Sequence, residues 1–444
     1  MQNAPLIDLT SKLADIAQTR PFGRVVFADG HILRIAGLED EVQLGDRLRL
    51  IRRDGSTLSG DVLCLGQEGV TMLPDEPPLR VALADRVLSS GPVRIAPDNG
   101  WIGRVVDPYG AALDGKPLRQ GTARFDIRAD PPAAISRKQL GSRLKTGFHL
   151  LNTMLPVARG QRIGIFAGSG VGKSRLLADL VQAMDADVVV IALVGERSRE
   201  INNFTQNVLG ETGMTRSVVV AASAEAGPNA RYRCPLTAMR VAEFFRDQGR
   251  QVLLFVDSIT RFAEAHREIA VSAGEFPSLR GFPPSTPPEI TKIAERAGPG
   301  PDGCGDITAI FSVLVAASDM NEPVADMLRG VLDGHIVLER KLADRGQFPA
   351  IDVLRSVSRC LPSAASPAEN GVISKARRLV ATYEDAAALV QSGLYSAGAD
   401  AELDHAIAFR KSFEDFATGR TVDDIGASFE RLQLCLRRCG ASNE

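Results

Sequence analysis

The chain lacks the apolar segments that would place it in or across a membrane. Its longest aliphatic runs, such as residues 188–194, are far shorter than the roughly 20 residues of a membrane-spanning helix. The start MQNAPLIDLTSK does not have the basic-then-apolar order of a secretory signal. We therefore expect a cytoplasmic protein.

Cysteine and excess charge are also scarce. The six cysteines are scattered and too few for a disulfide scaffold. Cys435 and Cys439 are one helical turn apart, but no histidine or third cysteine lies nearby to complete a zinc site. The 52 basic and 54 acidic residues give a net charge of −2, so no global field attracts nucleic acid or an anionic membrane. Any such partner would have to be held locally.

What the chain does have is enough apolar sequence for a large core, since 44% of its 444 residues are hydrophobic. We expect two or three domains. Residues 5–18, PLIDLTSKLADIAQ, place apolar side chains at helical spacing, which predicts an N-terminal amphipathic helix within residues 1–19. This helix either packs on its own domain or docks a partner.

Short apolar strands separated by turn signals fill residues 20–92. Examples are RVVF, HILRI, GDRLRLI, DVLCL and VTML. The pattern predicts a small β-barrel domain. Barrels of this size sometimes bind single-stranded nucleic acid, but this one has eleven acidic against nine basic residues, and only Phe22 and Phe27 are aromatic. We therefore expect no nucleic-acid binding.

A different pattern occupies residues 162–315, where apolar runs such as RIGIF, VVVIALV and QVLLFV alternate with helix-like segments. Unbroken apolar strands predict an α/β fold with a parallel sheet covered on both faces. Beyond residue 365 strand runs stop, and SKARRLVATYEDAAALVQSG and SFERLQLCLRRC have apolar residues at three- and four-residue spacing. We assign residues 93–364 to the α/β domain and residues 365–444 to a helical domain.

The strand RIGIF runs into AGSGVGKS, which leads directly into the helix-like SRLLADLVQAM. Strand, glycine-rich turn and helix together predict a P-loop, although Ala167 replaces the glycine of the strict pattern. Backbone N–H groups of the turn would hold ATP phosphates. Lys173 would reach the β- and γ-phosphates, and the Ser174 hydroxyl would bind Mg²⁺. The other cofactor-binding residues predicted here are Gly168, Ser169, Gly170, Val171 and Gly172.

Two carboxylates follow apolar strands in the same way. Asp257 ends QVLLFVD, and Glu196 follows VVVIALVG, so both are expected at the carboxyl edge of the sheet, where α/β proteins bind ligands. Asp257 would hold Mg²⁺, which leaves Glu196 to activate the attacking water. The alternatives are a strand-end cap for Asp257 and a surface loop residue for Glu196.

These motifs occur with others in one order along the chain: AGSGVGKS, VGERSRE, VDSITRFAEAHREIA, GFPPS, LDGHIVLERKLADRGQFPAID and SVSR. Over roughly residues 20–440 the sequence resembles the rotary-type ATPases, and within them the flagellum-specific export ATPases. The resemblance implies a hexameric ring with ATP at subunit boundaries, an N-terminal barrel, a RecA-like core and a C-terminal helical domain.

The resemblance also implies roles for single residues. Arg197 would make a supporting contact in the site, and Arg359 in SVSR matches an arginine finger supplied to the neighbouring subunit. The alternative for Arg359 is an intrachain salt bridge. Relatives carry an adenine-stacking aromatic residue where the nearest alignment here places Asn370, so the adenine contact is left unassigned.

The implied function is Mg-dependent ATP hydrolysis that energises export of flagellar proteins. The implied partners are other copies of the chain, a regulatory stator-like subunit, the export gate, export chaperones and the exported proteins. This places the chain at the inner face of the cytoplasmic membrane, with peripheral membrane association. The alternatives are an injectisome secretion ATPase, a Rho-type RNA translocase and a non-catalytic nucleotide-binding subunit.

Overall fold

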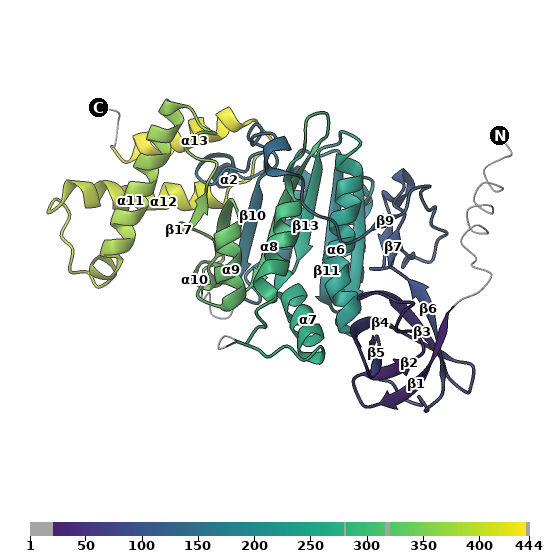
Figure 1. Cartoon of the computed structure of the whole chain (residues 1–444). Coiled ribbons are helices and arrows are strands. Elements are labelled where there is room, and N and C mark those ends of the chain that lie inside the picture. Colours follow the sequence, from purple (N-terminus) through teal and green to yellow (C-terminus); the bar gives the residue numbers. More distant parts are fainter. Residues whose placement is uncertain (1–20, 279–280, 316–319, 441–444) are drawn as a thin grey trace. The chain divides into compact units, whose positions relative to one another are not determined.

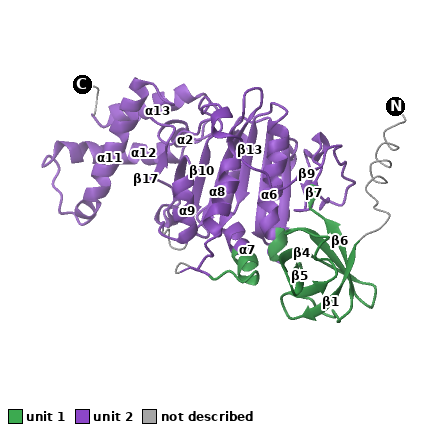
Figure 2. Cartoon of the chain, in the orientation of Figure 1, with its two compact units in different colours: residues 1–94, 226–230, 267–276 green, residues 95–225, 231–266, 277–444 purple. Residues whose placement is uncertain are grey.

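The computed structural model describes residues 21–278, 281–315 and 320–440. The chain divides into two compact units (Figure 2): residues 1–94, 226–230 and 267–276 form unit 1, and the remainder forms unit 2. The predicted N-terminal helix lies outside the described residues. The predicted division into four segments stays a prediction. No helix in the described parts is long and apolar enough to cross a bilayer.

Unit 1 contains the predicted barrel. Six antiparallel strands close it in the order β1-β2-β5-β4-β3-β6 (Figure 1). Buried residues alternate with partly exposed ones, as in β3, where Leu48 and Leu50 are fully buried and Arg47, Arg49 and Ile51 are partly exposed. The strands are β1 (Phe22–Ala28), β2 (Leu33–Ala36), β3 (Arg47–Ile51), β4 (Thr57–Gly66), β5 (Gly69–Pro74) and β6 (Arg86–Gly91).

The closing strand β6 was not among the strands predicted from sequence. Its residues RVLSSG contain only two apolar side chains and end in small polar residues, so the local strand signal is weak. Pairing with both β1 and β3 makes it a strand, and its Val87 points into the barrel core.

Unit 2 is built on a nine-stranded sheet in the order β17-β16-β10-β15-β13-β11-β12-β8, with β14 paired to β15. The parallel arrangement predicted from the apolar runs is confirmed from β16 to β8, whereas β17 and β14 pair antiparallel. The strands are β8 (Val105–Val106), β10 (Arg162–Ala167), β11 (Val188–Glu196), β12 (Ser217–Ser223), β13 (Val252–Asp257), β14 (Gly298–Pro299), β15 (Asp306–Leu314), β16 (Gly334–Leu338) and β17 (Ile351–Ser358). A two-stranded sheet joins β7 (Arg94–Ile95) and β9 (Phe125–Asp126).

Helices flank this sheet and form the C-terminal part (Figure 1). They are α2 (His149–Thr153), α3 (Lys173–Ala183), α4 (Ser198–Asn203), α5 (Gly210–Met214), α6 (Pro228–Arg246), α7 (Ile259–Ser272), α8 (Thr286–Arg296), α9 (Pro323–Val331), α10 (Arg340–Asp344), α11 (Pro367–Gln391), α12 (Ala401–Thr418) and α13 (Ile425–Arg438). A π-helical segment, Phe204–Leu209, lies between α4 and α5. The helices predicted in the C-terminal part are confirmed as α11 and α13, and α12 lies between them.

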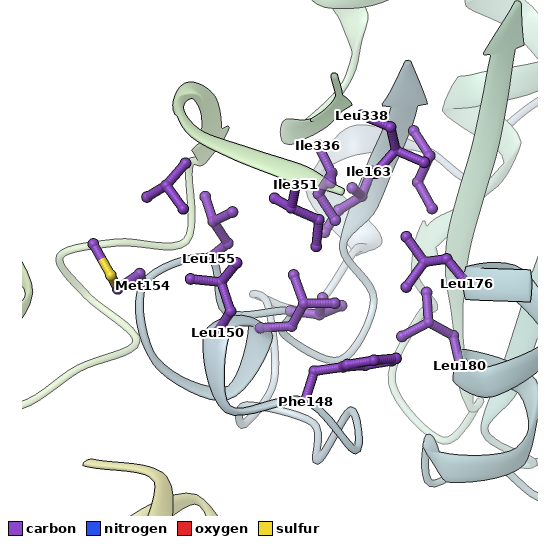
Figure 3. Packing of buried hydrophobic residues seen from close by; sticks show 14 of the residues in the cluster. Phe148, Leu150, Met154, Leu155, Ile163, Leu176, Leu180, Ile336, Leu338 and Ile351 are labelled. Carbon is purple, nitrogen blue, oxygen red and sulfur yellow. The ribbon is translucent and has the colours of Figure 1, made fainter. Parts of the chain in front are cut away.

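The core of unit 2 joins α2 to the sheet. Figure 3 shows Leu150 and Leu155 at α2 together with Ile163 of β10, Leu176 of α3 and Ile351 of β17 in one buried cluster. The same cluster contains residues of α11, α12 and α13. Helix α2 also packs against α12 and α13. This shared core fixes the strand ends from which the candidate site is built.

Candidate active site

The predicted P-loop joins β10 to α3 as expected. Gly170 and Gly172 have φ angles of +76° and +88°, a left-handed conformation that favours glycine. Helix α3 begins at Lys173, so the free N–H groups of its first turn face the loop and favour bound phosphate. The Arg340 guanidinium of α10 donates to the Ser169 carbonyl at 2.5 Å, which holds the outer part of the loop.

Lys173 lies against two other strands at the carboxyl edge of the sheet. Its ammonium group forms an ion pair with Asp257 Oδ1 at the end of β13 and lies 3.3 Å from Ser312 Oγ of β15. The Ser312 hydroxyl donates to the same Asp257 oxygen at 2.6 Å. Asp257 is only 5% exposed, so this network fixes a buried carboxylate directly beside the P-loop lysine.

A cavity of about 120 Å³ adjoins this cluster. Its polar lining consists of Ser174, Glu196, Glu200, Asn203 and Asp257. Burial raises the pKa of Glu196 to about 7, and a hydrogen bond with Glu200 and the charge of Asp257 act in the same direction. A carboxyl group with a pKa near neutrality can accept a proton from water at physiological pH.

Arg197 does not join the cluster. Its side chain is 76% exposed and forms an ion pair with Glu200 at 3.6 Å. Arg197 is thus linked to the cavity lining through Glu200 of α4. Neither Glu200 nor Ser312 was predicted from the sequence. Glu200 belongs to the motif VGERSRE, which carries predicted site residues, whereas Ser312 lies in β15, which carries none.

Arg359 follows β17, which runs antiparallel to β16. The carboxyl end of β16 pairs with Ala167 at the start of the P-loop, whereas Arg359 follows the pair of Ser358 with Gly334 at the amino end. Arg359 is thus at the opposite sheet edge from its own P-loop. In the described part of the chain it forms no ion pair, and its guanidinium donates to the Arg329 carbonyl at 3.1 Å.

An aromatic side chain beside the P-loop was not predicted from the sequence. Phe348 is 51% exposed, and its ring lies so close to Gly172 that a Cβ there would be 3.0 Å from Phe348 Cδ1. Asn370, which the nearest alignment places where relatives carry an adenine-stacking aromatic residue, donates to the Pro362 and Ala365 carbonyls, each at 3.0 Å. Phe348 is visible in the motif GQFPAID, but only the fold places its ring beside Gly172.

The donors present fit Mg²⁺. Mg²⁺ prefers oxygen ligands and keeps several waters and substrate phosphates in its coordination shell. The Ser174 and Asp257 side chains provide such oxygens at the border of the cavity. The described residues contain no group of three or more His, Cys, Asp or Glu side chains suited to a metal, so substrate and water would complete the shell.

Comparisons with known proteins agree with this geometry. Residues 147–358 match the ATP synthase alpha/beta family, nucleotide-binding domain, and residues 365–425 match the T3SS EscN ATPase C-terminal domain. The flagellum-specific ATP synthase of Caulobacter vibrioides is 40% identical over 403 residues, which cover 89% of this chain and 90% of the relative.

Solved structures give the same result. The assembled ATPase EscN from the type III secretion system of enteropathogenic E. coli superimposes with a TM-score of 0.86 and 32% identity, covering 93% of this chain and all of that one. EscN in complex with its central stalk EscO gives a TM-score of 0.82 and 33% identity, with the same coverage of both chains.

Fold and site together define a P-loop ATPase with an N-terminal barrel and a C-terminal helical part. The substrate is a nucleotide. The chain belongs to the family of flagellum-specific ATP synthases and type III secretion ATPases.

Proposed function

We propose that this ATPase requires Mg²⁺, works as a homohexameric ring and energises the export of flagellar proteins through a type III secretion apparatus. The observation that carries the proposal is the division of the predicted catalytic residues between two sheet edges. Lys173, Glu196 and Asp257 lie around one edge, and Arg359 lies at the other. One chain thus holds all of these groups at one site except the Arg359 guanidinium, which comes from a second copy.

The residues at the P-loop edge of the sheet have different roles in hydrolysis. The loop amides from Gly168 to Gly172 bind the phosphates, and the Lys173 ammonium neutralises charge on the β- and γ-phosphates. Glu196 orients the attacking water and accepts its proton, a role that its raised pKa supports. Bound through Ser174 and Asp257, Mg²⁺ would neutralise further phosphate charge.

Arg359 acts as an arginine finger in the site of the neighbouring subunit, where a guanidinium stabilises charge that develops on the transferred phosphoryl group. Its exposure and its place away from its own P-loop support this role over an intrachain salt bridge. Arg197 acts indirectly, because its ion pair holds Glu200 beside Glu196.

Phe348 stacks on the adenine base. An exposed ring at the P-loop provides a flat apolar surface, and stacking of a base on an aromatic side chain contributes about 1–3 kcal/mol. This proposal assigns the adenine contact, which the sequence left unassigned.

The flagellar system is favoured over the injectisome because the Caulobacter flagellum-specific relative is more similar in sequence than EscN. EscN assembles and binds a central stalk, which supports a ring and a stalk or stator-like partner for this chain, alongside export chaperones and the export gate. We place it in the cytoplasm at the inner face of the membrane. The Lys173→Ala variant would distinguish flagellar export from the injectisome, because the exported proteins of the two systems differ. Loss of flagellar subunits from the medium would indicate flagellar export.

The test of the ring mechanism is specific ATPase activity against protein concentration at saturating Mg-ATP. For the wild-type chain we expect activity per chain to rise with concentration, because subunits must meet to complete a site. Arg359→Ala should lower kcat by about 10³-fold or more while nucleotide binding persists. Arg378→Ala, which removes another exposed arginine, one that pairs with Glu402, is the control and should behave as wild type. Concentration-independent activity that survives Arg359→Ala would show that one chain suffices.

A further inference from the structure

The backbone and side chain of Arg359 are both attached to one turn. The Arg359 N–H donates to the Asp333 carbonyl at 2.9 Å, and its guanidinium donates to the Arg329 carbonyl at 3.1 Å. Residues 329–333 comprise the end of α9 and the link to β16, and we call them the α9–β16 turn. Because both acceptors belong to this turn, its position decides where the guanidinium of Arg359 lies.

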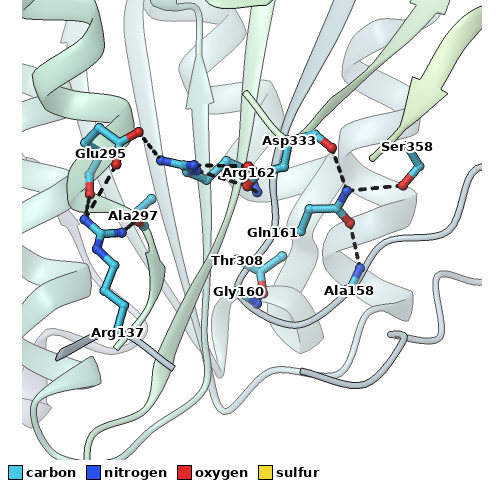
Figure 4. Close-up of polar contacts among 10 residues, drawn as sticks. All are labelled: Arg137, Ala158, Gly160, Gln161, Arg162, Glu295, Ala297, Thr308, Asp333 and Ser358. Atoms are coloured by element: carbon cyan, nitrogen blue, oxygen red, sulfur yellow. Dashed lines mark hydrogen bonds and ion pairs between the residues drawn. The ribbon is translucent and has the colours of Figure 1, made fainter. Parts of the chain in front are cut away.

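Asp333 anchors the turn to β10 (Figure 4). Its Oδ2 accepts from Arg162 Nε and its Oδ1 from Arg162 Nη2, each at 3.0 Å, and Oδ2 also accepts the Arg162 backbone N–H at 3.0 Å. In return the Asp333 N–H donates to the Arg162 carbonyl at 2.8 Å. Paired guanidinium–carboxylate bonds are strong and directional, so they fix both the position and the orientation of Asp333.

Two neighbouring side chains complete the attachment. Gln161, which is fully buried, donates from Nε2 to the Asp333 carbonyl at 2.9 Å and lies 3.2 Å from Ser358 Oγ, one residue before Arg359. Glu295 holds Arg162 from the other side, with Oε1 2.6 Å from Arg162 Nη1 (Figure 4). Charged and buried polar contacts therefore connect β10 to Arg359 without a break.

We propose that Asp333 is a positioning residue for Arg359: held by Arg162 and Gln161, it sets the placement of the Arg359 guanidinium in the neighbouring active site. This inference rests on the proposed role of Arg359. A finger must lie close to the transferred phosphate, and a displacement of about 1 Å of a catalytic group costs roughly 10²-fold in rate. Strand β10 carries the P-loop at its far end, about 20 Å away for six extended residues.

The first test is Asp333→Asn in the full-length chain. The amide cannot accept from both Arg162 nitrogens as an anion does, so we expect kcat for Mg-ATP to fall by about 10- to 100-fold. KM and nucleotide affinity should stay within twofold, because the chain's own P-loop is at the other sheet edge. Arg162→Gln breaks the same pair from the donor side and should give a similar loss, so failure of either variant to fold leaves the other as the test.

Asp306→Asn is the matched control. Asp306 begins the neighbouring strand β15 at the same edge, and its carboxylate lies 2.8 Å from Lys138 Nζ. Asp306→Asn makes the same chemical change to another paired aspartate, one that the contacts described above do not connect to Arg359. We expect its kcat to stay within twofold of wild type, with melting temperatures of all variants reported alongside.

The decisive measurement combines Asp333→Asn with Arg359→Ala in a single-turnover assay with radiolabelled ATP, which resolves slow residual rates. If Asp333 acts only through Arg359, the double variant is as slow as Arg359→Ala alone. Losses that multiply, or equal losses in Asp333→Asn and Asp306→Asn, would overturn the proposal in favour of general structural damage. A normal rate in Arg359→Ala alone would instead refute the proposed role of Arg359.

Discussion

Gly172 meets two requirements at the P-loop. Its φ of +88° is a conformation that other residues rarely adopt, and the Phe348 ring occupies the space that a Cβ would need. The glycine thus shapes the phosphate-binding turn and lets an aromatic ring approach it. Substitution of Gly172 would disturb both features at once, which makes Phe348 the better residue to vary.

Phe348→Ala should raise KM for ATP by about tenfold, because about 1.4 kcal/mol of base stacking is lost. We expect kcat to change by less than twofold, since Lys173, Glu196 and Asp257 are untouched. Steady-state kinetics measures both constants. Phe348→Tyr keeps a ring at the position and is the control. An unchanged KM in the alanine variant would remove Phe348 from the nucleotide site.

At the scale of elements, α2 and α13 are joined by a buried polar contact. His149 in α2 is 7% exposed, its Nδ1 lies 3.1 Å from Ser428 Oγ in α13, and its ring stacks on Phe416 of α12. Burial lowers the pKa of His149, with the positive charge of Arg431 acting the same way and the negative charge of Asp423 opposing it. The C-terminal helices therefore dock on a neutral histidine.

This docking predicts a pH dependence of stability. The unfolded chain binds a proton at His149 near its ordinary pKa of about 6.5, whereas the folded chain does so only at lower pH. The stabilisation is therefore fully present above about pH 6.5 and falls as the pH drops toward the folded pKa. We expect His149→Gln to reduce the difference in melting temperature between pH 7.5 and pH 5.5. The control is His31→Gln, at an exposed position; equal pH profiles for wild type and His149→Gln would contradict the prediction.

At the scale of the whole molecule, the sheet separates the P-loop from Arg359. The P-loop begins at the carboxyl end of β10, and Arg359 follows the antiparallel edge strand β17. The proposed completion of the site by association of copies rests on this separation.

Mixing two inactive variants tests this directly. Lys173→Ala loses its own phosphate site but keeps Arg359, and Arg359→Ala keeps its site but supplies no finger. Mixed as dilute chains and then concentrated, they should regain activity, because random assembly makes roughly one interface in four complete. Each variant alone should stay inactive. A mixture no more active than its components would contradict a site shared between chains.

Much of the fold was predictable because its signals are local. The alternating residues of β3 predict a barrel strand, and the buried runs of β10 and β13 predict a covered sheet, since each depends only on neighbours along the chain. Strand β6 was missed because it is made by its pairing partners, not by its own composition.

The same division holds for the candidate site. The phosphate-binding turn was predictable from the residues alone, as were the strand ends that carry Glu196 and Asp257 and the motif that contains Arg359, because each depends on a short stretch of the chain. Three properties become visible only in the folded chain: Asp257 bonds to Lys173, burial raises the pKa of Glu196 to about 7, and Arg359 lies at the opposite sheet edge from its own P-loop. These properties depend on distance and burial between segments far apart in the chain, which no local pattern encodes.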